Sequence, residues 1–175
     1  MRNRIDFEPV FFAPFVSSMM TIDGAWIGPN GLVKPSFFNV LFERGLDEAL
    51  RLLGQGGMLR RNDEIHGEDR AAFIASEAHV RYLQDLPGDA PVRVTVRLID
   101  YDNVHIHVYL SLHHGTEGWL CATSEQILSH VDADLHRELP IPDPMLERVA
   151  GMKAVHGALP EPDDLGRRVE IFPRS

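Results

Sequence analysis

The sequence predicts one α+β domain in which a curved antiparallel sheet wraps around a single long helix. Three observations lead to this fold class. Residues 35–53 form an amphipathic segment, strand-like runs follow between residues 72 and 134, and a turn at Gly28–Gly31 comes directly before the helix. One long helix among this many strands needs a sheet curved enough to enclose it.

Composition supports this view. The chain has 175 residues, of which 44% are hydrophobic and 25% charged, as in soluble globular domains. We expect one domain over residues 1–175, with a core at about 10–134 and a C-terminal helical extension at 135–175. The chain has no apolar run of membrane-spanning length, and its N-terminal segment resembles a signal peptide only weakly. We therefore expect a cytoplasmic protein without a membrane partner.

Charge and cysteine content narrow the function. A net charge of −9 argues against a general nucleic-acid surface, although a local basic pocket could still bind a phosphate-bearing ligand. The single cysteine, Cys121, excludes an intrachain disulfide and suits a reducing compartment. Because it lies in an apolar run, we expect a packed thiol rather than a nucleophile.

The N-terminal part is expected to lead into the helix. Residues 1–9 are predicted to be a loose arm, and Val10–Ile22 a first strand that is kinked or at an edge, because Pro14 cannot donate a ladder hydrogen bond. Residues 23–34, rich in Gly, Pro and Asn, are predicted to be a loop.

The helix is predicted over Pro35–Leu53, where Pro35 and Ser36 are typical first residues and the glycines from Gly54 onward end it. Its apolar residues share one wide face: Phe38, Leu41, Phe42, Gly45, Leu46, Ala49, Leu52 and Leu53. The opposite face carries Arg44, Asp47, Glu48 and Arg51, with Asn39 and Glu43 at the border.

After a polar connection at residues 58–70, alternating residues predict antiparallel strands with one apolar face. In the run 74–82, the expected apolar face is Ile74, Ala78, Val80 and Tyr82. The runs 92–98, 104–112 and 119–131 continue the meander. A C-terminal helix is predicted over 144–159, followed by an extended, peripheral tail from Pro160.

The other face of the sheet is expected to carry polar residues. His105 and His107 point the same way from one strand, which raises the possibility of a metal site. A metal needs three or four converging ligands, so we favour a solvated or interface-forming face with cross-strand Glu–Arg and His pairs. We predict no metal site.

Common catalytic motifs are missing from the sequence. No Gly-x-Ser-x-Gly elbow, Gly-x-Gly-x-x-Gly pattern or phosphate loop occurs. What remains is the helix start, whose N–H groups can polarise a carbonyl or hold an anion, with Gly31 permitting close approach. A plain Asn30-Gly31 turn without a ligand explains the same residues equally well.

Several local strings resemble the hotdog-fold acyl-CoA thioesterases. The similarity is strongest to the thioesterase-like branch that includes 4-hydroxybenzoyl-CoA thioesterase relatives and betainyl-CoA thioesterase domains. The strings are WIGPNG at 26–31, FERGLDEAL at 42–50, LG at 53–54, EAHVRYL at 77–83 and ATSEQILSHVD at 122–132. The strings occur in the same order and with similar spacing as in this branch, and the resemblance covers residues 10–160.

The resemblance implies a homodimer or tetramer that binds an acyl-CoA thioester at a subunit interface. The thioester carbonyl would meet the N-terminal end of the helix, and a carboxylate would attack it or activate water. Coenzyme A would be part of the substrate, and no cofactor is expected.

The sequence departs from the branch pattern Asp-x-Asn-Gly-His. Gly28 stands in place of the acid and Leu32 in place of the histidine, while Asn30 and Gly31 remain. Asn30 can orient a water or a carbonyl but cannot act as a carboxylate. Some hotdog thioesterases carry the catalytic carboxylate on the helix itself, so the resemblance points to Glu43, at the border of the apolar face, as catalytic together with Asn30. A plain exposed helix acid is the alternative for Glu43, and Asp47 is expected to be solvated.

The resemblance also suggests ligand contacts. Candidate substrate-binding residues are Gly31, Lys34, Thr123 and Gln126, with Arg60 and Arg61 as further phosphate contacts and Phe37 and Phe38 as an apolar lining. Two alternatives stay open: a non-catalytic acyl-CoA-binding hotdog protein and, ranked last, a hydratase or dehydratase.

Overall fold

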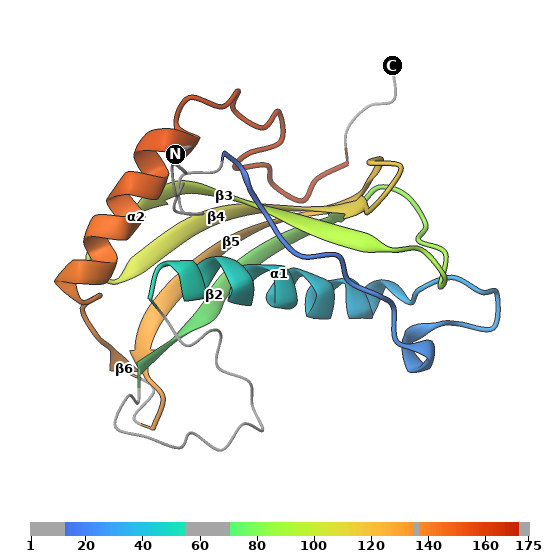
Figure 1. Cartoon of the computed structure of the whole chain (residues 1–175), viewed down its shortest axis with the longest axis horizontal. Coiled ribbons are helices and arrows are strands. Elements are labelled where there is room, and N and C mark those ends of the chain that lie inside the picture. The colour runs from blue at the N-terminus through green and yellow to red at the C-terminus, as the bar shows by residue number, and fades with distance from the viewer. Residues whose placement is uncertain (1–12, 55–70, 135–136, 172–175) are drawn as a thin grey trace, which may run out of the picture.

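The computed structural model describes residues 13–54, 71–134 and 137–171. Its central element is the helix α1 (Phe38–Leu52), over which an antiparallel sheet curves (Figure 1). The prediction of an α+β fold with a curved sheet around one long helix is confirmed. In the part of the chain described, no helix has the length and apolar character needed to cross a membrane.

The sheet is built mainly from long strands that follow α1 in the chain: β2 (Ala71–Tyr82), β3 (Val92–Tyr101), β4 (His105–His114) and β5 (Leu120–Asp132). Its strand order is β1-β3-β4-β5-β2, with neighbours antiparallel. The short β6 (Arg137–Glu138) pairs with β5. Strand β2 therefore lies at one edge of the sheet, and β1 (Phe15–Val16) lies at the other.

The core lies between α1 and the sheet. Alternation along β3 buries Val92, Val94, Val96 and Leu98, and register pairs such as Val96 with Leu110 continue the apolar face across β4. The helix stripe meets this face at Gly45, where an added Cβ would lie 2.4 Å from the Val94 Cβ. The helix thus approaches β3 as closely as its backbone allows.

The first strand is much shorter than predicted. Of the part of the expected strand Val10–Ile22 that the structure describes, from residue 13 onward, only Phe15–Val16 forms β1, and Met20 adds a single bridge to Val92. The chain then turns along α1, where the Ser18 backbone N–H donates to the Glu48 Oε2 at 2.8 Å. The prediction that this segment lies at an edge is correct, because β1 pairs with β3 alone.

Two details of the predicted helix differ from the structure. Pro35–Phe37 form a 3-10 turn, and α1 begins only at Phe38. Asp47, predicted to be solvated, is 5% exposed. A helical wheel of one segment carries no information about the tertiary contacts that remove Asp47 from solvent.

The predicted alternation of the run 74–82 is wrong in its first half. The register of β2 against β5 shifts between Ala75 and Glu77. This bulge exchanges the two faces, so Phe73, and not Ile74, is fully buried. Beyond the bulge, Val80 packs against the core as expected, whereas Tyr82 remains 52% exposed.

The C-terminal helix α2 (Asp143–His156) packs along β3 and adds Met145, Val149 and Met152 to the core. Its last residue, His156, is fully buried, and its Nδ1 accepts a hydrogen bond from the Leu98 backbone N–H at 2.9 Å. The bond lies at the β3 bulge after Leu98, where the ladder is interrupted.

The tail after α2 is not peripheral, in contrast to the prediction. It crosses the sheet on the side opposite α1 (Figure 1). Arg97 donates to the carbonyls of Leu159 and Pro160. Asp164 accepts from Arg81 at 2.5 Å and from the Tyr109 hydroxyl at 2.5 Å. This tail therefore covers part of the face that was expected to be solvated.

Burial and the Asp164 hydrogen bond raise the pKa of Tyr109 to about 12. Burial alone would raise the pKa of Asp164, but the hydrogen bonds from Tyr109 and Arg81 outweigh it and lower that pKa. Asp164 is thus held as a carboxylate that ties the tail to β2 and β4.

The arm at residues 1–9, the polar connection at 58–70 and the candidate phosphate contacts Arg60 and Arg61 lie outside the described residues.

We expect Gly45→Ala to destabilise the protein. Overpacking against Val94 costs about 1–3 kcal/mol, while the better helix propensity of Ala returns at most about 1 kcal/mol. Urea unfolding measures the change in unfolding free energy. Arg51→Ala on the exposed side of α1 is the control and should change it by less than about 0.5 kcal/mol. A Gly45→Ala protein as stable as the wild type would contradict the close packing.

We expect Asp164→Asn to lower stability by about 1–3 kcal/mol at neutral pH, because hydrogen bonds to a charged acceptor are lost. The folded-state pKa of Asp164 is lowered from 3.8, so its contribution is present above that value and is lost as the pH falls through the lower folded-state value. The difference between wild type and variant should therefore disappear in acid. The exposed neighbour Asp163→Asn is the control. A difference that grows in acid would contradict this account.

Candidate functional site

The turn before α1 belongs to a small hairpin. Ile27 bridges to Val33, and the Gly28 N–H donates to the Leu32 carbonyl at 2.8 Å. Gly31 has a φ of +76°, a conformation that L side chains rarely adopt, and nothing lies within 4 Å of an added Cβ. The Gly31 N–H donates to the Gly28 carbonyl and its own carbonyl accepts from Gly88, and Gly31, predicted to bind substrate, is not among the residues that line the cavity described below.

A second segment, between β2 and β3, is bonded to this hairpin. The Val33 N–H donates to the Leu86 carbonyl at 2.8 Å, and the Gly88 N–H donates to the Gly31 carbonyl at 3.0 Å. Residues far apart in sequence thus form adjoining walls at the start of the helix.

The start of α1 lies at the 3-10 turn, where the N–H groups of Phe37 and Phe38 already donate to the carbonyls of Lys34 and Pro35. Among the described residues, no side chain caps the 3-10 turn at Lys34 or α1 at Phe37. Backbone N–H groups at a helix N-terminus carry partial positive charge. This end can therefore stabilise a carbonyl oxygen on which negative charge develops.

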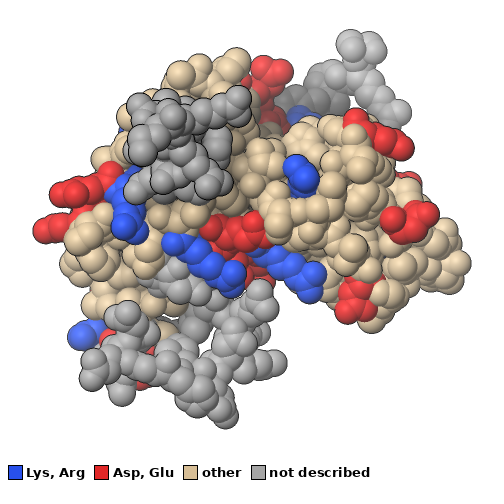
Figure 2. Space-filling view, in the orientation of Figure 1, with Lys and Arg blue, Asp and Glu red and all other residues tan. Residues whose placement is uncertain are grey.

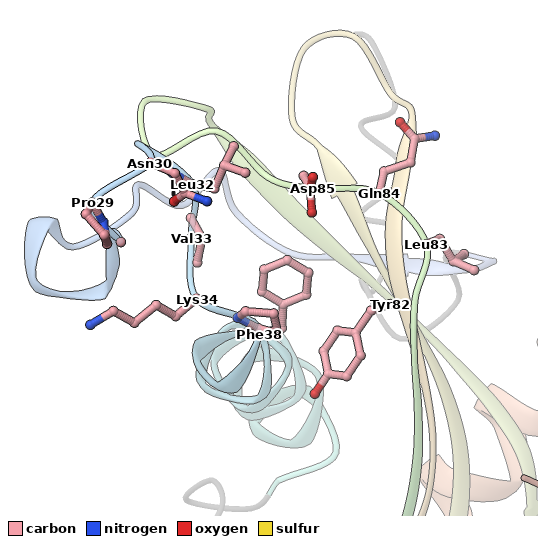
Figure 3. Close-up of a pocket in the computed structure, with 12 residues that line it drawn as sticks. Pro29, Asn30, Leu32, Val33, Lys34, Phe38, Tyr82, Leu83, Gln84 and Asp85 are labelled. Atoms are coloured by element: carbon pink, nitrogen blue, oxygen red, sulfur yellow. Dashed lines mark hydrogen bonds between the residues drawn. The ribbon is translucent and has the colours of Figure 1, made fainter.

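A cavity of about 880 Å³ lies at this point (Figure 3). The Phe38 ring, which is only 2% exposed, forms part of its wall. The Asp85 carboxylate points toward that ring, whereas the Lys34 side chain extends away from it (Figure 3). The lining residues are Gly28, Pro29, Asn30, Leu32, Val33, Lys34, Pro35, Phe38, Tyr82, Leu83, Gln84 and Asp85.

Asn30 lines the cavity, and the oxygen of its side-chain amide already accepts a hydrogen bond. Its Oδ1 accepts from the Leu32 N–H at 3.2 Å, which stabilises the turn. The Nδ2 hydrogens make no hydrogen bond to other described residues and remain available to a ligand. Asn30 is therefore arranged as a donor and not as a base.

The aromatic residues near the helix start divide into two pairs. Phe38 and Tyr82 lie with ring centroids 5.7 Å apart and line the cavity. Phe37 stacks on Trp26 at 5.5 Å, and Arg44 lies over the Trp26 ring at 4.7 Å. Of the two phenylalanines expected to form an apolar lining, Phe38 does so, whereas Phe37 instead packs on Trp26.

The structure does not bring all predicted site residues together. Glu43 is exposed on α1 and is not among the residues that line the cavity. Gln126 is buried, with its Nε2 donating to Ser124 at 2.9 Å. Thr123 lies on the opposite face of β5 and donates to Asp164 beneath the tail. Thr123 and Gln126 are three positions apart, so a strand directs them to opposite faces.

Sequence reasoning missed Tyr82 and Asp85. Tyr82 was assigned to the sheet core, and Asp85 lies in a connection that was treated as a plain loop. No periodicity places Asp85 on the same cavity as Asn30. The two segments are joined by the Val33–Leu86 hydrogen bond, a non-local pairing without a local sequence signal.

The outer face carries the expected pairs. His105 Nδ1 lies 2.9 Å from Asp102 and its Nε2 lies 3.0 Å from Glu138, while His107 Nε2 lies 2.8 Å from Glu125. The hydrogen bond to Asp102 raises the pKa of His105 and lowers that of Asp102 to about 2. No group of three possible metal ligands converges within the described ranges.

Cys121 is fully buried, and burial raises the pKa of its thiol to about 11. A thiol in this state is a poor nucleophile at neutral pH. The core role expected for Cys121 is therefore consistent with its surroundings.

Comparison with known proteins identifies the family. A model of the thioesterase-like superfamily matches residues 22–149. The chain belongs to this superfamily. The match includes every residue that lines the cavity and ends before Asp164.

Members of the superfamily with similar sequences include the betainyl-CoA thioesterase of Pseudomonas aeruginosa. It is 28% identical over 148 residues, which are 85% of this chain and 89% of the relative. The L-carnitine dehydrogenase/betainyl-CoA thioesterase of Rhizobium meliloti is 26% identical over 148 residues, again 85% of this chain, but only 28% of that longer protein.

Solved structures of similar fold include a Staphylococcus aureus protein in complex with CoA. Its TM-score is 0.76 at 21% identity, covering 91% of this chain and 96% of the other. A Thermus thermophilus thioesterase complexed with coenzyme A and zinc gives a TM-score of 0.60 at 18% identity, with coverage of 79% and 95%. These likenesses support the hotdog fold of this superfamily member.

Proposed function

We propose that the protein is an acyl-CoA thioesterase that hydrolyses its substrate in the cavity at the start of α1. The observation that carries this proposal is the uncapped helix start facing an 880 Å³ cavity, with the Asn30 amide nitrogen at its wall. Membership of the thioesterase-like superfamily supports the same reaction.

In this proposal the thioester carbonyl oxygen accepts a hydrogen bond from the Asn30 Nδ2 and lies in the partial positive charge at the N-terminal end of α1. Negative charge develops on this oxygen as the carbonyl carbon becomes tetrahedral. Donors fixed in place before the reaction stabilise that charge without a cost of reorganisation. Water is the only other reactant, so we propose that no cofactor is needed.

The rest of the substrate would extend in two directions. The acyl group would lie against the Phe38 and Tyr82 rings, whose tilted arrangement offers an apolar wall. The exposed Lys34 ammonium, which extends away from the Phe38 ring, would contact a CoA phosphate at the mouth (Figure 3). We also propose that the reaction occurs in the cytoplasm.

We further propose that two copies pair along β2 to form a homodimer. Strand β2 is at the edge of the sheet, and an unpaired edge is a template for another strand. Residues Ala75–Ala78 in the middle of β2 are exposed, as are Tyr82 and Leu83 beside the cavity. Glu43 is exposed on α1, and its catalytic role stays a prediction.

A non-catalytic acyl-CoA-binding protein is the second candidate. It is favoured by one observation: Gly28 and Leu32 occupy the positions where the resemblance leads us to expect an acid and a histidine. The donor groups of the cavity could then hold a thioester without cleaving it.

We expect the wild type to release free thiol from acyl-CoA substrates, with betainyl-CoA and neutral acyl-CoA esters of similar size compared in one panel. Asn30→Ala should lower kcat by about 100-fold through loss of one oxyanion donor. Gln84→Ala is the matched control, because Gln84 lines the cavity but points away from it (Figure 3). Binding of acyl-CoA without any thiol release would favour the non-catalytic alternative.

Light scattering should give the mass of two chains for the wild type. Ala78→Glu should yield monomers with reduced turnover, because it places like charges together where two β2 strands pair. Ala78→Ser, which adds a small neutral group, should remain dimeric. A wild-type monomer with full activity would contradict the proposed assembly.

A further inference from the structure

We propose that Asp85 is the carboxylate that activates water for attack on the thioester. This inference rests on the proposed hydrolysis. It assigns the general base to the connection between β2 and β3, a part of the chain for which the sequence predicted no catalytic role.

The cavity needs a base that the turn does not supply. Asn30 cannot accept a proton at neutral pH, and Gly28 and Leu32 have no titratable group. Glu43 is not among the residues that line the cavity of its own chain. Among the residues that line the cavity, Asp85 is the carboxylate.

The surroundings of Asp85 suit this role. Its carboxylate points toward the Phe38 ring (Figure 3). It makes no hydrogen bond or ion pair with any other residue that the structure describes, so both oxygens are available to water. A carboxylate within hydrogen-bond reach of the attacking water can take up its proton as the new bond forms.

The backbone on both sides of Asp85 is fixed. Before it, the N–H groups of Leu83 and Gln84 donate to the Cys121 carbonyl at 2.9 and 3.0 Å. After it, Leu86 is fully buried and accepts from Val33 at 2.8 Å. Hydrogen bonds to β5 before Asp85 and to the segment that leads into α1 after it therefore fix the backbone at Asp85. The reacting carbonyl would lie at the start of α1.

Asp85 takes one proton from water while the water oxygen forms a bond to the carbonyl carbon. The tetrahedral intermediate collapses, the carbon–sulfur bond breaks and the sulfur leaves with the bonding electrons. The proton on Asp85 passes to that sulfur, which leaves free CoA thiol, the carboxylic acid and an ionised Asp85.

Steady-state hydrolysis by Asp85→Asn tests this role. We expect kcat to fall by about 100-fold or more, the usual contribution of a general base, while KM changes by less than about threefold. Asp85→Glu should retain part of the activity. Asp89→Asn is the matched control, because Asp89 is an exposed aspartate of the same connection that does not line the cavity.

Calorimetric titration of Asp85→Asn with the acyl-CoA should show binding close to that of the wild type, which establishes that the variant is folded with an intact cavity. Wild-type turnover that Asp85→Asn leaves unchanged would overturn the assignment and leave the proposed function standing. A variant that raises KM alone would also overturn it, because Asp85 would then bind substrate without taking part in the chemistry. A wild type that releases no thiol would overturn both.

Discussion

The close packing of α1 on β3 is the constraint on which the rest of the structure depends. Gly45 lets the helix backbone approach Val94 to a separation that no larger residue permits. At this separation the apolar stripe of α1 fits the curved sheet, and burial of that stripe stabilises both elements. The direction of the helix, and therefore the position of its N-terminal end, follows from this contact.

Figure 2 shows that acidic and basic side chains are both present on the molecular surface seen in this view, without one sign dominating it.

The candidate site arises from two connections that meet at that end. The hairpin before α1 and the segment after β2 are bonded through Val33 and Leu86, so neither wall depends on side chains alone. Asn30 supplies donors from one wall and Asp85 a carboxylate from the other. In the proposed reaction, stabilisation of the oxyanion and activation of water, the two tasks that thioester hydrolysis requires, are therefore carried out from different walls of the cavity. The tail held by Asp164 lies on the opposite side of the sheet and leaves this cavity open.

Periodicity in the sequence was sufficient for the helix, the long strands and their apolar faces, because these depend on local alternation. It failed at Ile74, where a bulge exchanged the faces, and at Asp47, which is buried although the helical wheel placed it on the solvent side. The turn at Asn30 was found because its residue types have a local meaning. Asp85 was missed for the opposite reason: its segment is joined to the one that carries Asn30 by a hydrogen bond between Val33 and Leu86, more than fifty positions apart.

The most direct test of the account is a crystal structure with an acyl-CoA analogue in which a methylene replaces the thioester sulfur. The account predicts that its carbonyl oxygen lies about 3 Å from the Asn30 Nδ2 or a helix-start N–H, the usual hydrogen-bond distance. The carbonyl carbon should face Asp85 across one water. An analogue bound on the outer face of the sheet, or in the cavity with its carbonyl turned away from α1, would contradict the central claim.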